Sequence, residues 1–161
     1  PDKEAIGGFK ASHNFPQKLG HLWPVPENLI SIVVFADDEV IFDKEYRGIK
    51  VILANTTAKK ARFAASDGRL YMIQEAIDSR GKWRPVELMP EIFCGYSHHY
   101  VFLDSTEFWE FTIPRFSGSM PTKLRLRLDR SQGKKQRFIY SNEFYGSVNP
   151  EQFSNRSGMY F

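Results

Sequence analysis

Short segments of the chain alternate apolar and polar residues, which is the pattern of β-strands that bury one face. The segment "KLRLRL" (123–128) shows it most clearly, because three leucines alternate there with Lys123, Arg125 and Arg127. A sheet with one dry face and one wet face produces this alternation. We therefore predict a strand over 122–129 in an antiparallel sheet.

The same period predicts strands along most of the chain after Leu29. Segment 69–78 also fits helical spacing, but a hairpin signal follows it directly, with Asp78 to open the turn and Gly81 for the left-handed position. A strand is therefore the better interpretation, and Pro85 predicts that the returning strand is an edge strand or carries a bulge. The predicted strands cover residues 29–35, 46–57, 61–66, 69–78, 82–88, 97–104, 108–114, 122–129 and 137–144.

The number and spacing of these strands indicate the fold class. Short strands with turns about every 8–12 residues are typical of an antiparallel β-sandwich. The strand count resembles that of immunoglobulin-like or fibronectin-type modules, although the single cysteine excludes the Cys…Trp…Cys signature of true immunoglobulin domains. We predict an all-β, immunoglobulin-like antiparallel sandwich as one domain over 29–161. An irregular N-terminal arm over 1–28 precedes it, where Pro16, Pro24 and Pro26 disfavour regular structure.

Composition agrees with this class. Aromatic residues make up 15% of the 161 residues, and large flat side chains suit a pleated surface. A chain of this length buries a core without a metal or disulfide, and no apolar run reaches the roughly 18–20 residues of a membrane span. The chain begins at Pro1 without an initiator methionine, so we expect a processed protein, secreted or periplasmic, or a part of a longer one. Sequons at Asn55 and Asn155 would accept glycans only in a eukaryotic secretory pathway.

The segment "CGYSHHY" (94–100) holds the only cysteine beside two histidines. Cysteine catalysis needs a thiolate with a neighbouring imidazolium. On a strand, however, His98 and His99 point to opposite faces, so at most one of them shares a pocket with Cys94. Adjacent histidines on a strand also diverge too far to chelate zinc. We predict a structural role for this segment, and neither a metal site nor a cofactor.

Carboxylate pairs offer an enzymatic alternative. Glycosidases use two carboxyl groups about 5 to 9 Å apart across a cleft. Glu75 and Glu87 lie on strands that we expect to pair, and Glu107 and Glu110 lie on another. The chain lacks a glycine-rich phosphate loop, a Gly-x-Ser-x-Gly elbow and an HExxH motif. A carboxylate-dependent glycoside hydrolase is therefore the alternative hypothesis, and a chain that is not an enzyme is the preferred one.

A basic strip over 122–137 offers a polyanion-binding alternative. Formal net charge is only +3, but seven of the basic residues fall within 122–138 against the single acid Asp129. Such a strip is able to meet phosphates or acidic polysaccharides, whereas charge on an edge strand also prevents aggregation between sheets. Because no aromatic residues interleave with Lys123, Arg125 and Arg127 on their face, we do not expect a nucleic-acid partner.

Aromatic residues outside the predicted core are the best basis for a binding hypothesis. Trp83 follows a hairpin turn and Trp23 lies in the proline-rich arm, so both are candidates for exposure. Exposed aromatic side chains often anchor protein partners or stack on sugars. Our leading prediction is a non-catalytic binding or accessory domain that contacts protein or carbohydrate through Trp23, Trp83, Lys123, Arg125 and Arg127.

Overall fold

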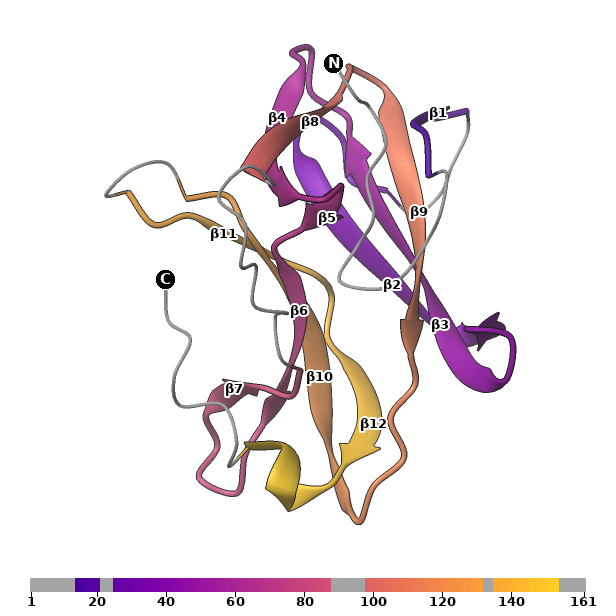
Figure 1. Cartoon of the computed structure of the whole chain (residues 1–161), viewed down its shortest axis with the longest axis vertical. Helices are drawn as coiled ribbons and strands as arrows, with labels where there is room; N and C mark the ends of the chain where they lie inside the picture. The colour runs from indigo at the N-terminus through magenta and orange to yellow at the C-terminus, as the bar shows by residue number, and fades with distance from the viewer. Residues whose placement is uncertain (1–13, 21–24, 88–97, 132–134, 154–161) are drawn as a thin grey trace.

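The computed structural model describes residues 14–20, 25–87, 98–131 and 135–153, and within them the fold is all-β with antiparallel sheets (Figure 1). One 3-10 turn, η2 (Pro150–Phe153), follows the last strand. The strands are β1 (Gln17–Lys18), β2 (Ile30–Phe42), β3 (Tyr46–Asn55), β4 (Ala61–Ser66), β5 (Arg69–Leu70), β6 (Met72–Ile77), β7 (Trp83–Pro85), β8 (His98–Leu103), β9 (Glu107–Pro114), β10 (Met120–Asp129), β11 (Phe138–Tyr140) and β12 (Phe144–Val148).

The strands form three sheets. The β3 sheet has the order β1-β9-β3-β2, so β2 forms one of its edges. The β10 sheet has the order β11-β10-β6-β7, and β12 pairs with the first half of β10 while β11 pairs with the second half. The β4 sheet has the order β5-β4-β8. In Figure 1 the β4 sheet lies above the β10 sheet, and β6 continues from β5.

One hydrophobic core joins the inner faces of all three sheets. Trp109 of β9 is fully buried there, and its ring meets that of Phe63 in β4 edge-on, with centroids 5.5 Å apart. The three leucines of "KLRLRL" are buried in the same core, while the intervening cations point outward. This confirms the prediction of one dry and one wet face for β10.

A second, smaller cluster lies on the opposite face of the β3 sheet. Ile52, Ala54 and Phe108 are buried there, and Leu19 and Val25 of the N-terminal segment pack against them. The part of the predicted arm that the structure describes therefore covers this face, and Gln17–Lys18 adds to the edge of β9 as β1.

The strand predictions need several changes. The predicted strand 69–78 is two strands, β5 and β6, which belong to different sheets. β2 runs to Phe42, well past the predicted end at residue 35, with a register shift between Phe35 and Glu39 that accommodates the acidic segment. The predicted strand 137–144 is two strands, β11 and β12, because residues 141–143 leave the ladder. The hairpin at 78–83 is confirmed: Asp78 accepts hydrogen bonds from two backbone N–H groups, and Gly81 has a φ of 74°.

Asn55, the first sequon, is a buried polar residue that links three parts of the fold. Its amide donates to the carbonyls of Lys59, Leu103 and Asp104 at 2.8, 3.0 and 3.1 Å, and its side-chain oxygen accepts from Thr57. The residue is 0% exposed. The fold therefore leaves no room for a glycan on Asn55, whichever compartment the protein occupies.

We expect Asn55→Ala to lower the free energy of unfolding by about 3 kcal/mol, because three backbone carbonyls lose a hydrogen bond from a fully buried amide. Urea denaturation measures the change. As a control, Gln136→Ala at an exposed position should stay within about 0.5 kcal/mol of the wild type. Equal stability of Asn55→Ala and the control would show that this network does not hold the fold.

Candidate functional site

The outer face of the β10 sheet gathers three of the residues predicted to bind a ligand. Cross-strand pairing places Arg125 of β10 opposite Glu75 of β6, and Arg127 opposite Tyr140 of β11. Trp83 pairs with the end of β6 from β7. Together with Phe138 these side chains form what we call the aromatic–arginine face, which consists of Glu75, Trp83, Arg125, Arg127, Phe138 and Tyr140.

Glu75 lies at the centre of this face and is almost completely buried, with a side chain 3% exposed. Arg125 donates to its Oε2 atom from Nε and Nη2 at 3.0 and 2.9 Å, and Arg127 Nη1 lies 3.0 Å from Oε1. An isolated buried carboxylate is costly, so both oxygens need charged partners. The cluster keeps one net positive charge, because two guanidinium groups meet one carboxylate.

Aromatic rings hold both guanidinium groups. The Cζ atom of Arg125 is 4.2 Å from the ring centroid of Trp83 and 3.9 Å from that of Tyr140. The Cζ atom of Arg127 is 4.9 Å from the centroid of Phe138. Cations over aromatic faces are attracted to the ring quadrupole, most strongly where water is excluded. Arg125 is therefore fixed by two hydrogen bonds to one carboxylate oxygen and by rings from two other strands.

Lys123, the next predicted site residue along β10, belongs to a neighbouring pair. Its Nζ atom lies 2.9 Å from Oε2 of Glu143 and 5.8 Å from the ring centroid of Tyr145. The hydrogen bond and the charge of Glu143 raise the pKa of Lys123. The expected lack of aromatic residues near these cations is wrong, because β7, β11 and β12 supply rings that the sequence of β10 does not contain.

The ion pairs of the basic strip weaken the polyanion hypothesis. Lys123, Arg125 and Arg127 all have carboxylate partners. Arg130, farther along the strip, points back to the protein: it donates to the carbonyl of Arg62 and lies 4.9 Å from the ring centroid of Phe63. Much of the positive charge that a polyanion would need is therefore already paired or partly buried.

The two carboxylates of the hydrolase hypothesis point in different directions. Glu75 joins the arginines on the outer face, while Glu87 accepts from the backbone N–H and the side-chain amide of Gln74 at 2.7 and 2.9 Å. Gln74 is buried and alternates with Glu75 along β6, so its side chain lies on the inner face. Glu107 is also buried and bonded to Lys18, whereas Glu110 is exposed. Neither predicted pair faces a common cleft.

The described histidines have separate environments. Nδ1 of His98 lies 2.7 Å from the hydroxyl of Tyr71, whose pKa is raised by burial, and Nε2 of His99 accepts from the N–H of Gly68 at 3.2 Å. Cys94 and Trp23 lie outside the described residues. Within the described ranges, no group of three or more His, Cys, Asp or Glu is arranged to hold a metal, and no helix there is long and apolar enough to cross a membrane.

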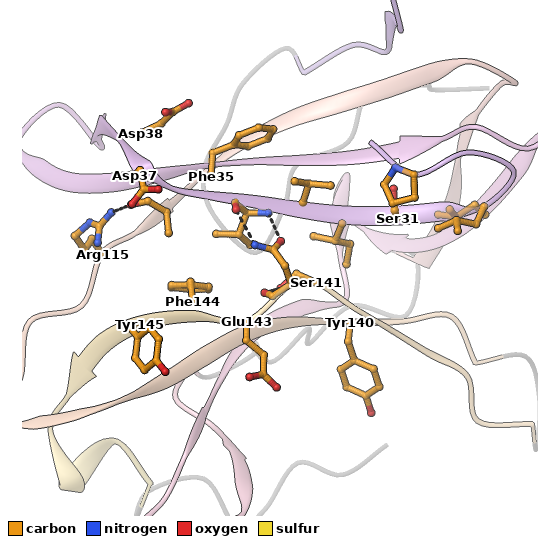
Figure 2. A pocket seen from close by; sticks show the side chains of 18 residues that line it. Ser31, Phe35, Asp37, Asp38, Arg115, Tyr140, Ser141, Glu143, Phe144 and Tyr145 are labelled. Carbon is orange, nitrogen blue, oxygen red and sulfur yellow. Dashed lines mark hydrogen bonds between the residues drawn. The ribbon is translucent and has the colours of Figure 1, made fainter. Parts of the chain in front are cut away.

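A groove that the sequence does not reveal lies between β2 and the segment 140–145. It encloses about 830 Å³ and is lined mainly by residues 29–38 of β2 and its lead-in, by Arg115 and by residues 140–145. Figure 2 shows Tyr140, Glu143 and Tyr145 pointing away from β2, and Phe144 pointing toward it. The groove is therefore distinct from the aromatic–arginine face, although the same segment borders both. The polar break "SNE" within an otherwise strand-like segment was its only sequence signal.

Comparisons with known proteins add no family. A search against models of protein families gave no match, and a search of curated proteins gave none. The geometry of these two surfaces is therefore the basis for a functional proposal.

We expect Glu75→Gln to destabilise the fold by about 3 kcal/mol, because two partly buried arginines lose their carboxylate. Thermal or urea unfolding measures this. The triple variant Glu75→Leu, Arg125→Met, Arg127→Met removes all three charges and should recover most of the loss. A Glu75→Gln protein as stable as the wild type would show that the ion cluster is not a structural element.

Proposed function

We propose that this chain is a non-catalytic binding domain, built on an immunoglobulin-like sandwich, that contacts a protein partner through the aromatic–arginine face. The sandwich is supported by the shared core, across which the β3 sheet meets the other two sheets. The absence of catalysis is supported by the engagement of Glu75 and Glu87 on opposite faces of β6. The aromatic–arginine face itself carries the proposal.

The residue types and their rigidity favour a protein partner. Tryptophan, tyrosine and arginine are the residues that most often dominate binding energy at protein interfaces. Here Arg125 contacts both Trp83 and Tyr140 before any partner arrives. Side chains that are already ordered lose less conformational entropy on binding. Tyr140 is 45% exposed, so the face offers unburied aromatic surface. Tyr145, beside Lys123 and next to the face, is 77% exposed.

Carbohydrate is the alternative ligand. Sugars stack on flat exposed rings, but Arg125 already covers one face each of Trp83 and Tyr140. Tyr145 is the most exposed aromatic ring in the described residues. One exposed ring is weak support for a carbohydrate-binding site. The ordered contacts of Arg125 with Trp83 and Tyr140 are stronger support for a protein interface.

The test is photo-crosslinking from position 145. A photoreactive phenylalanine analogue replaces Tyr145, crosslinked proteins from extracts of the source organism are identified, and each is purified and titrated calorimetrically against the unmodified domain. We expect Trp83→Ala and Tyr140→Ala each to weaken binding of the true partner about 30-fold, as for interface residues worth about 2 kcal/mol.

Tyr46→Ala is the matched control, because Tyr46 is 61% exposed but lies on the β2–β3 hairpin. It should leave the affinity unchanged. Equal binding by all variants, or no purified protein that binds, would contradict the proposal. A glycan that binds the wild type and not Trp83→Ala would replace the protein partner with a carbohydrate.

A further inference from the structure

The outer edge of β2 carries backbone groups that have no strand beside them. The backbone N–H of Thr56, the residue after β3, donates to the carbonyl of Leu29 at 3.1 Å, so the backbone carbonyl of Leu29 faces β3. Both backbone groups of Val34 bond to the side chain of Asn142, so they face away from β3. In an antiparallel ladder the backbone groups of alternate residues point to the same edge. Ile30, Ile32 and Val34 therefore direct their N–H and C=O groups into the groove, away from β3.

Ile32 has the unpaired backbone groups that matter most for the groove. Its side chain is buried in the core, and its backbone faces the groove without a hydrogen-bond partner among the described residues. Unpaired backbone at a sheet edge is a template for another strand. The groove beside it holds about 830 Å³, which leaves space for an added segment.

Asn142 already imitates such a strand at one position. Its side-chain oxygen accepts from the N–H of Val34 at 2.7 Å, and its amide donates to the carbonyl of Val34 at 3.0 Å. These are the two bonds that a paired strand residue makes. An incoming strand that displaces Asn142 therefore replaces two hydrogen bonds with two of the same kind and adds new ones at Ile32.

The lining of the groove defines the chemistry of the occupant. One part is apolar, with Leu29, Ile30 and Val33, and Leu29 is 43% exposed. The other part contains Asp37, Asp38, Glu143 and Arg115, and the guanidinium of Arg115 donates to the carbonyl of Ala36. Asp38 pairs with Lys50 at 3.2 Å, and Glu143 pairs with Lys123 at 2.9 Å. Asp37 is exposed and has no ion pair among the described residues, so it is the carboxylate left to pair with a basic residue of the occupant.

We propose that β2 is a strand-addition site for an extended segment of a partner protein, with alternating apolar residues beside Ile30–Val34 and a basic residue beside Asp37. Backbone pairing supplies the affinity, and the apolar part of the groove and Asp37 supply specificity. This site goes beyond the aromatic–arginine face and does not depend on it.

The test pans a phage library of random peptides against the whole protein and analyses the enriched sequences as synthetic peptides. We expect alternating apolar residues with a lysine or arginine at one end, and nuclear magnetic resonance shifts concentrated in residues 30–38. Methylation of the peptide backbone nitrogen at alternate residues should abolish binding, because it removes the pairing N–H groups. Asn142→Ala should bind the peptides about tenfold more tightly, because no side chain has to be displaced.

Trp83→Ala is the control and should bind these peptides as the wild type does, which separates this site from the aromatic–arginine face. If Asn142→Ala is unstable, binding of the methylated peptides to the wild-type protein still tests whether backbone pairing holds the peptide. No enriched peptide, shifts outside β2, or tolerance of methylation at every position would overturn the proposal.

Discussion

The buried carboxylate of Glu75 is the constraint on which the β10 sheet and its outer face depend. It lies under the sheet surface with two arginines from the neighbouring strand, and a charge so enclosed is stable only while both partners stay in place. β10 pairs with β6, β11 and β12, so the strand that supplies these arginines also connects the rest of its sheet. The ion cluster thus joins the stability of the sheet to the order of its exposed face.

The same constraint explains why the face suits recognition. Arg125 has its position set by Glu75, and Trp83 and Tyr140 gather around it from strands on either side of the β6–β10 pair. An interface made of such side chains is assembled during folding and not at the moment of binding. The groove at β2 has a different origin: there a sheet edge is closed at one residue by Asn142 and left open at the next backbone pair.

Local sequence predicted the strands well because alternation is a property of neighbouring residues. The strand over 122–129, the hairpin at Asp78 and Gly81, and the preference for strand over helix at 69–78 are all confirmed. Trp83, Arg125 and Arg127 were identified separately, as an aromatic anchor and as part of a basic strip. They were predicted to contact the same ligand, but their direct contacts around Glu75 were not predicted. Glu75 and Arg125 are 50 residues apart in sequence, and only strand register brings them together.

The groove was missed for a related reason. Asn142 lies in a segment that alternates like a strand, and nothing local shows that its amide bonds to Val34, 108 residues away. The burial of Asn55 was not predicted either, because a sequon has the same sequence pattern whether its asparagine is buried or exposed. Contacts between distant segments decide these features, and a single sequence does not contain them.

The most direct test of the account is the mobility of the Arg125 side chain in the free protein. Nitrogen-15 relaxation of its Nε–H group gives an order parameter on the picosecond-to-nanosecond timescale. If Glu75 and the two rings hold the guanidinium, the order parameter will be about 0.85, like that of rigid backbone. A value below about 0.6, as for a flexible group, would contradict the claim that this face is ordered before a partner binds.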